Sequence, residues 1–152
     1  MGQQQLLLLV LGIVIVGLAV VVGIQAFSEN QRKANADAMV TDALRIASDC
    51  QAWDLKPDQF GGSLATETLA ACTFDEIGFT NSGSPPTYTN VNGDYTLPTS
   101  LPGGCKTAPT IPSGSTPLIY VYGTNSQTLN HVCVGIGGTQ ADDVGTSITF
   151  GT

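Results

Sequence analysis

The sequence contains few charged residues. Asp, Glu, Lys and Arg together make up 11% of the 152 residues, whereas about 25% is usual for a soluble domain. Only five of these residues are Lys or Arg, and the formal net charge at pH 7 is −7. A surface that binds nucleic acid needs clustered cations to neutralise phosphate groups. This composition therefore argues against nucleic acid as a partner.

The motifs of several kinds of active site are also missing. His131 is the only histidine, and no G-x-S-x-G element accompanies it, so a general base with a nucleophile is not indicated. The cysteines form no zinc spacing and no haem attachment motif. Asp142 and Asp143 match no EF-hand loop, and a solvated acidic loop is the favoured interpretation, as it is for Asp75 and Glu76. We expect a protein that is not an enzyme and that holds no metal or other cofactor.

Charge is completely absent from the first part of the chain. The 22 residues from Leu6 to Phe27 are apolar apart from three glycines and Gln25. About 20 apolar residues suffice to cross a bilayer as a helix. A cleaved signal peptide is the alternative, but such a peptide has a basic start and an apolar run of about 7–15 residues, and residues 1–5 contain no Lys or Arg. We therefore expect a retained helix that lies in a membrane or in a protein bundle.

An amphipathic pattern continues this helix over residues 28–56. Small and apolar residues recur every three or four positions, which is typical of a helix face that packs on a sheet: Ala36, Val40, Ala43, Ala47, Cys50 and Trp53. Charged residues, Asp42 among them, mostly occupy the other side of this predicted helix. Pro57 predicts the end of the helix, because proline disfavours helical geometry in the residue before it.

The remaining residues, 57–152, contain all eight prolines and most of the β-strand signals. We expect a short helix over 64–72 and strands over the following ranges: 88–91, 95–97, 118–122, 131–136 and 147–150. Residues 80–117 are rich in Ser, Thr and Pro and predict exposed loops that carry O-linked glycans. The alternation of Tyr120 and Tyr122 with Ile119 and Val121 places one of these pairs on the outside. The predicted fold class is α+β: a long N-terminal helix, with membrane and sheet-packing halves at 1–27 and 28–56, packed on a small antiparallel sheet.

The four cysteines are even in number: Cys50, Cys72, Cys105 and Cys133. In a small, loop-rich domain behind a membrane helix, this count indicates two disulfides formed in an oxidising compartment. Three pairings are open. The pairs Cys50–Cys72 and Cys105–Cys133 are favoured because each closes a loop of about 20–30 residues, which stabilises a fold by about 3 kcal/mol.

The disulfides place the domain after the apolar run outside the cytoplasm, and the basic residues near the run conflict with this orientation. Arg32 and Lys33 lie on the cysteine-bearing side of the run, whereas basic residues normally mark the cytoplasmic side. A basic leader removed during maturation would resolve the conflict. We therefore expect Met1 to be a processed N-terminus.

These features resemble the type IV pilins and the related pseudopilins. Mature chains of that family begin with a processed, often N-methylated apolar residue, which Met1 would match. An uncharged helical segment follows in the family, as Leu6 to Ile24 does here, and then an amphipathic half-helix beneath an antiparallel sheet, as Ala36 to Trp53 does here. The resemblance covers the first fifty residues by pattern and the remainder by architecture.

The resemblance implies a structural subunit that polymerises with copies of itself into an extracellular filament on the cell surface. Adhesion, motility or surface contact would follow from the polymer. Before assembly, the chain would be a single-pass inner-membrane precursor handled by the pilus assembly machinery. The residues expected to contact neighbouring copies in the filament core are Met1, Gln5, Leu6, Leu9, Ile13, Gly17, Val20 and Ile24.

Two positions depart from the family pattern. Pilins usually carry glutamate at the fifth mature position, where it is thought to meet the N-terminal amine of a neighbour, but this chain has Gln5. An amide accepts a hydrogen bond and offers no compensating charge, and the family's minor tip subunits also lack the acid. A proline near position 22 is common in the family, and Val22 in its place predicts an uninterrupted helix.

Two alternative functions stay open. A pseudopilin or minor pilin of a secretion or DNA-uptake machine is the first, and Gln5 favours it. The second is a single-span enzyme or binding module that the helix merely tethers to a membrane. A tether tolerates a scrambled apolar segment of equal hydrophobicity, whereas a filament core does not.

Overall fold

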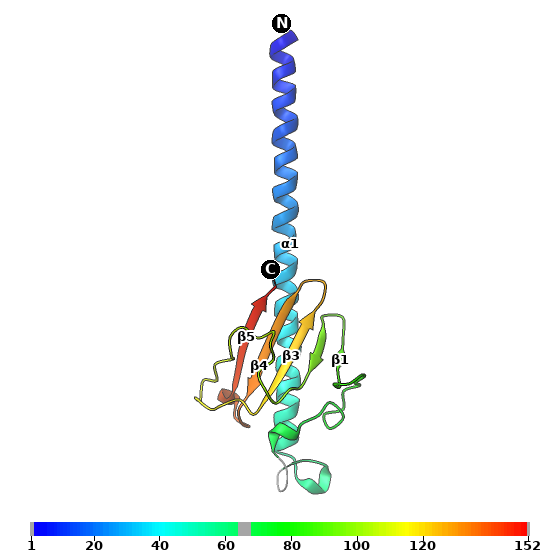
Figure 1. The fold of residues 1–152 in the computed structure, drawn as a ribbon, viewed down its shortest axis with the longest axis vertical. Helices are drawn as coiled ribbons and strands as arrows, with labels where there is room; N and C mark the ends of the chain where they lie inside the picture. Colours follow the sequence, from blue (N-terminus) through cyan, green and yellow to red (C-terminus); the bar gives the residue numbers. More distant parts are fainter. Residues whose placement is uncertain (1, 64–67, 152) are drawn as a thin grey trace. The chain divides into compact units, whose positions relative to one another are not determined.

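The chain forms one long α-helix followed by a five-stranded antiparallel sheet (Figure 1). The computed structural model describes residues 2–63 and 68–151. Its elements are α1 (Gly2–Asp54), η1 (Asp58–Phe60), η2 (Leu69–Ala71), β1 (Tyr88–Thr89), β2 (Asp94–Thr96), β3 (Ile119–Asn125), β4 (Asn130–Ile136), η3 (Ala141–Asp143) and β5 (Val144–Phe150). The predicted α+β class is confirmed.

The chain divides into two compact units, Met1–Ala34 and Asn35–Thr152. We call the second the head unit. This boundary falls within α1, and the head unit includes the last twenty residues of the helix.

Helix α1 is continuous from Gly2 to Asp54 and passes through Val22 without a break, as predicted. It ends where the sequence places a helix-breaking signal. The last turn closes with hydrogen bonds from Leu55 N to Gln51 O (3.2 Å) and from Lys56 N to Trp53 O (3.1 Å), and the N-cap of η1 is Pro57. The short helix expected over 64–72 is only a single 3-10 turn at η2, and residues 64–67 lie outside the described part of the chain.

The sheet is a simple meander in the order β1-β2-β3-β4-β5. All five expected strands are present, but β3 and β5 are longer than predicted and β1 is shorter. In β3 the extra residues reach a tight turn in which Asn125 Oδ1 accepts hydrogen bonds from the backbone N–H groups of Gln127 and Thr128, each at 2.9 Å. In β5 the pairing begins three residues earlier than expected, at Val144 opposite Ile136.

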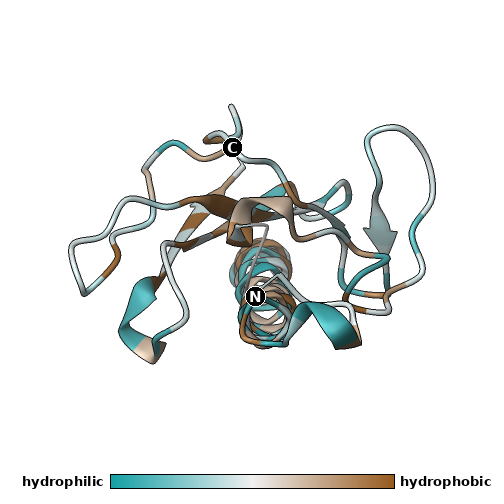
Figure 2. Ribbon diagram, turned by 90° about the horizontal axis from the view of Figure 1, so that it is seen from below, coloured by the Kyte–Doolittle hydropathy of each residue, from teal (hydrophilic) through white to brown (hydrophobic). Residues whose placement is uncertain are grey.

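The core of the head unit lies between the second half of α1 and one face of the sheet. Figure 2, which looks along α1, shows the strands crossing one side of the helix. Fully buried side chains from the helix meet fully buried side chains from β3 and β4: Met39, Ala43, Ile46, Ala47 and Cys50 on the helix, and Ile119, Val121, Val132, Val134 and Ile136 on the strands. Met39 and Ile46, which flank the predicted stripe, are more deeply buried than Val40 within it.

One carboxylate on α1 anchors the helix to the β1–β2 hairpin. Asp42 Oδ2 accepts hydrogen bonds from Asn92 Nδ2 (2.7 Å), Asn90 Nδ2 (2.8 Å) and the Tyr95 hydroxyl (3.1 Å). Burial and the neighbouring Asp42 carboxylate both raise the pKa of Tyr95 above its ordinary value. Asp42 therefore points into a polar contact within the head unit, whereas the sequence placed it on the solvated side.

Two amide side chains of α1, one at each end of its contact with the sheet, bond to the loops that connect the strands. Asn35 donates from Nδ2 to Asn92 O (3.1 Å), and its Oδ1 accepts from the Thr128 hydroxyl (2.8 Å). Sixteen residues further along the helix, Gln51 Nε2 donates to Gly138 O (2.6 Å) beyond the end of β4. The head unit is thus joined to α1 by polar contacts at both ends of the shared apolar core.

Replacing Asp42 by alanine should lower the free energy of unfolding by about 2–3 kcal/mol, because three partly buried donors lose their common acceptor. Chemical denaturation in detergent, followed by the fluorescence of the buried Trp53, measures this change. Asp37→Ala is the matched control, since Asp37 is an exposed acid on the same helix, and it should change stability by less than about 0.5 kcal/mol. Equal losses in the two variants would contradict the anchoring role.

Candidate assembly surface

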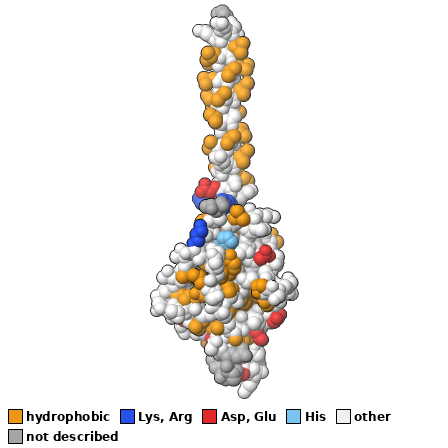
Figure 3. Space-filling model, in the orientation of Figure 1, with side chains coloured by type: hydrophobic (Ala, Val, Ile, Leu, Met, Phe, Trp, Pro, Cys, Tyr) orange, Lys and Arg blue, Asp and Glu red, His pale blue; other side chains and the backbone are white. Residues whose placement is uncertain are grey.

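The N-terminal part of α1 presents apolar side chains on every side. Every Leu, Ile, Val and Phe between Leu6 and Phe27 has 51–69% of its surface exposed. Figure 3 shows these side chains covering the helix above the charged residues. We call residues 6–27 the apolar segment. A helix that is hydrophobic all round occurs as a membrane span or in the interior of a protein assembly.

The predicted contact residues lie along one face of the apolar segment. Successive steps of three or four residues place Leu6, Leu9, Ile13, Gly17, Val20 and Ile24 in one row of the helix. The opposite faces are equally apolar, with Val14, Leu18 and Val22 exposed by 52%, 63% and 63%. A contact through one row alone would leave most of this surface in water. Gln5 lies on the exposed helix just before the segment, and Met1 lies outside the described residues.

Three glycines interrupt the apolar segment, and no contact with the described residues accounts for them. A Cβ atom added at Gly12, Gly17 or Gly23 would meet no heavy atom within 4 Å. Glycine in a helix interior costs about 1 kcal/mol relative to alanine, and no contact inside the described chain offsets this cost. Small residues of this kind let a second helix approach closely. The glycines therefore fit a surface that another helix covers.

The helix that contains the apolar segment is long and apolar enough to cross a membrane. Charge first appears one turn beyond Gln25, and Glu29 and Lys33 form an ion pair at 3.0 Å with both side chains largely exposed. Such a pair adds little stability. It marks the place where the helix surface changes from one suited to lipid or protein to one suited to water.

A different kind of surface lies on the face of the sheet that points away from α1. Residues 98–117, which we call the cover segment, lie against this face. A Cβ at Gly135 would lie 3.0 Å from Pro117 Cγ and 3.4 Å from Pro109 Cβ. The Ser147 hydroxyl donates to Thr107 O at 2.8 Å. Glycine at position 135 thus permits the close approach of the segment to the sheet.

The cover segment refines two sequence-based expectations. Residues 80–117 are mostly exposed, as predicted, except that Cys105, Pro109 and Ile111 of the cover segment are buried. Tyr120 points away from the helix and is only 8% exposed, and Tyr122 is half-buried, so neither forms an open outer surface. The Ser and Thr residues of the cover segment are exposed, and its buried contacts come from a cysteine, a proline and an isoleucine.

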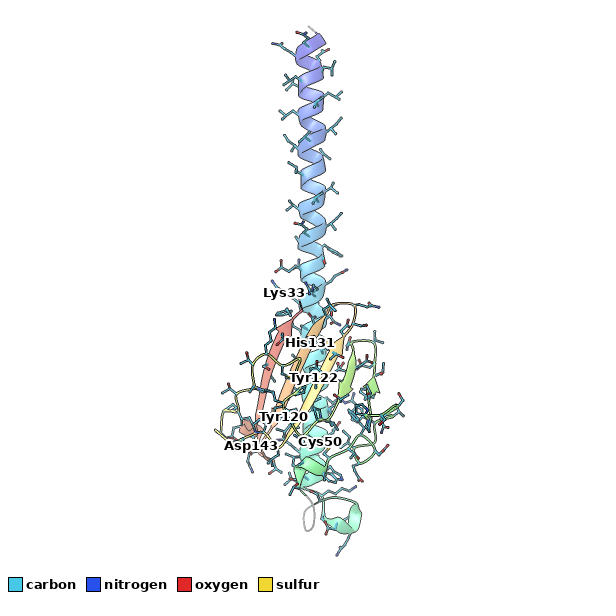
Figure 4. The ribbon with its side chains drawn as sticks, in the orientation of Figure 1. Lys33, Cys50, Tyr120, Tyr122, His131 and Asp143 are labelled. Atoms are coloured by element: carbon cyan, nitrogen blue, oxygen red, sulfur yellow. A yellow bond between two sulfur atoms is a disulfide. The ribbon has the colours of Figure 1, made fainter. Side chains whose placement is uncertain are left out.

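Both disulfides have the pairing that the sequence analysis favoured. Cys50 of α1 is bonded to Cys72 with Cα atoms 5.8 Å apart, and Cys105 of the cover segment is bonded to Cys133 of β4 with Cα atoms 6.1 Å apart. The first bond ties the end of α1, where Figure 4 labels Cys50, to the residue that follows η2. The second fixes the cover segment to the centre of the sheet.

His131 has a structural environment. Its Nδ1 lies 2.9 Å from the Tyr122 hydroxyl, and the two rings are parallel with centroids 5.9 Å apart. Figure 4 shows both side chains on the neighbouring strands β3 and β4. Burial raises the pKa of Tyr122. Cys133, the nearest sulfur in the sequence, is held in a disulfide and offers no nucleophile.

The acidic turn near the C-terminus is occupied by protein donors. Asp143 accepts hydrogen bonds from the Ser113 hydroxyl (2.6 Å) and from the backbone N–H of Gln140 (3.1 Å). These two bonds lower the pKa of the Asp143 carboxyl. Over residues 2–63 and 68–151, no group of three or more His, Cys, Asp or Glu side chains is placed to hold a metal ion. Asp143 instead ties the cover segment to η3.

No protein-family model matches this chain, and comparisons with curated proteins and with solved structures gave no match. The functional argument therefore depends on the surfaces described above.

The double variant Cys105→Ser/Cys133→Ser should lose about 3–4 kcal/mol of unfolding free energy, because the unfolded chain gains the entropy of a 28-residue loop. Limited proteolysis should then cleave the cover segment first, while the Cys50–Cys72 bond stays intact as an internal control. An unchanged unfolding midpoint together with an unchanged cleavage pattern would show that this bond does not hold the segment in place.

Proposed function

We propose that this protein is a structural subunit that polymerises through its apolar segment into an extracellular filament of the type IV pilus kind. The observation that carries the proposal is the apolar segment itself, which is exposed around its whole circumference and continues without interruption into the helix of the head unit.

The energetics favour a fully surrounded helix. Burying about 2,000 Å² of apolar surface at about 25 cal/mol per Å² contributes about 50 kcal/mol before the entropic losses of association. A soluble monomer does not tolerate an exposed apolar patch of this size. Two surroundings can cover it on all sides, namely lipid and a bundle of like helices.

Both surroundings have a place in the proposal. The chain first lies in the inner membrane as a single-pass precursor, where the apolar segment is long enough to span the bilayer. It then passes, through the pilus assembly machinery, into a bundle in which neighbouring copies replace the lipid. Contacts between parallel copies that do not close on themselves build an open helical array, and the three glycines permit close helix crossings in its core.

The head unit suits the outside of such a polymer. Its two disulfides persist in an oxidising compartment. Its own apolar core is complete, since the sheet is covered by α1 on one face and by the cover segment on the other. The head unit therefore needs no membrane and can carry the adhesive, motile or surface-contact role of the filament.

Gln5 favours a second candidate, a pseudopilin or minor pilin of a secretion or DNA-uptake machine. An amide in place of the family's usual acid offers no charge to a neighbour's N-terminal amine. A major subunit would form long homopolymers when expressed alone, whereas a minor subunit would appear as a few copies within filaments of another protein.

Scrambling residues 6–27 at constant composition should abolish filaments while the chain still inserts in the membrane, because a bundle requires particular positions of bulk and glycine whereas lipid requires only hydrophobicity. Electron microscopy of material sheared from expressing cells provides the measurement. Resistance to alkaline extraction and the formation of both disulfides are the controls for insertion and folding.

Each outcome separates the candidates. Filaments from the unaltered chain and none from the scrambled chain support the proposal. Filaments from both chains would exclude a specific helical core. The absence of filaments from the unaltered chain, with the protein present in the membrane, would contradict polymerisation and favour a tethered enzyme or binding module.

A further inference from the structure

Strand β5 forms one edge of the sheet (Figure 1), and its pairing with β4 is regular over all seven residues. Two backbone hydrogen bonds continue the same register beyond the strand ends, from Gly137 N to Asp143 O (2.9 Å) and from Gly151 N to Leu129 O (2.8 Å). Because backbone groups alternate in direction along a strand, the odd-numbered residues of β5 bond to β4.

The even-numbered residues of β5 therefore direct their backbone N–H and C=O groups away from the sheet: Val144, Thr146, Ile148 and Phe150. Among the described residues, no backbone hydrogen bond reaches these groups from outside the β4–β5 ladder. The edge is a row of unused donors and acceptors, which is the template on which a further strand can pair.

This edge lacks the features that usually prevent such pairing. Proteins protect edge strands with charge, proline, a bulge or shortness. Residues 144–150 contain no charge and no proline, and their register contains no bulge. The opposite edge is protected, because β1 has only two residues and follows closely on Pro85 and Pro86.

Exposed apolar side chains lie at the same edge. Ile148 and Phe150 are exposed by 41% and 46%, and Leu129, which accepts a hydrogen bond from Gly151 beyond the end of β5, is exposed by 48%. A strand added along β5 would cover Ile148 and Phe150 while it satisfies the backbone groups. Backbone and side-chain observations thus point to the same surface.

We propose that β5 pairs in antiparallel fashion with β5 of a second copy of this chain. The strand has no charge with which to select a charged partner, and a two-fold antiparallel contact satisfies both unpaired edges at once. With Ser147 opposite Ser147 of the second copy, all four outward-facing residues find partners. Thr146 then lies opposite the second copy's Ile148, and Val144 opposite its Phe150.

The two-fold axis determines the relative direction of the two chains that this contact joins. The axis is perpendicular to the sheet, so it reverses the direction of the strands and of the part of α1 that packs along the sheet in one head relative to the other. Two chains in one parallel array cannot meet in this way, so the contact joins heads of two filaments that run in opposite directions. This role in bundling rests on the proposed function. A single seven-residue pairing forms in concentrated protein, and its repetition along two polymers adds avidity.

The test places charge on the edge of otherwise intact filaments. Thr146→Lys and Ile148→Glu should each convert bundles into single filaments, seen by electron microscopy and as a loss of protein from low-speed pellets. Mixing the two kinds of filament should restore bundles, because the lysine introduced by the first substitution lies opposite the glutamate introduced by the second. Val91→Lys is the matched control, since Val91 is 99% exposed in the β1–β2 loop, and it should leave bundling unchanged.

The sign of the charge separates strand pairing from general electrostatics. The chain carries a net charge of −7, so added lysine reduces repulsion between filaments and would promote bundling if repulsion alone governed it. Strand pairing predicts the opposite for Thr146→Lys. Bundles that persist in this variant, or that Val91→Lys disperses equally, would overturn the inference.

Hydrogen exchange gives a second measurement on the detergent-solubilised chain, with or without filaments. In dilute protein the amides of Thr146, Ile148 and Phe150 should exchange freely, while those of Ser147 and Thr149 are protected. Raising the protein concentration should slow the exchange of the three outward-facing amides. Single filaments from the unaltered chain, with no concentration-dependent protection, would overturn the inference and leave the proposed function standing. The absence of any filament would overturn the proposed function, and the exchange pattern would still decide β5 pairing.

Discussion

The apolar segment has to be surrounded, and most of the account follows from this requirement. Its side chains are exposed on all faces of the helix, so a partner on one side would leave most of the apolar area in water. Lipid satisfies the requirement for a single chain, and a bundle of identical helices satisfies it for many. The interruption of the segment by glycines, which contact nothing in their own chain, favours the bundle as its final surroundings.

The head unit has the opposite requirement. It has to be stable in water, although the apolar segment at the start of the same helix is not. It achieves this with a sheet that is covered on both faces. The second half of α1 covers one face through a core of aliphatic side chains, and the disulfide-bonded cover segment closes the other. Asp42 and Gln51 hold the helix to the loops at the sheet's ends. The same helix thus serves two environments, and the change between them lies near the Glu29–Lys33 pair.

Sequence patterns predicted those features of the fold that depend on residues close to one another in the chain. The length of α1 followed from the absence of proline before Pro57, and the positions of the five strands followed from alternating residues separated by turns, whereas the order of the strands came from the structure. Features decided by long-range contacts were missed. Cys105, Pro109 and Ile111 are buried within the otherwise exposed cover segment, because Cys105 is bonded to Cys133 and Gly135 leaves room for close approach. β5 starts at Val144 because β4 pairs with it, although Gly145 is a weak strand former by itself. At the assembly surface, the apolar segment was evident from the sequence, and the structure adds that its side chains are exposed on every face of the helix.

Removal of detergent from the purified full-length protein, followed by electron cryo-microscopy, tests the central claim most directly. The account predicts ordered helical polymers with residues 6–27 of neighbouring copies packed together along the axis and the heads on the outside. Protein that stays dispersed as one chain per detergent micelle, or that collects only in shapeless aggregates under every condition tried, would contradict it.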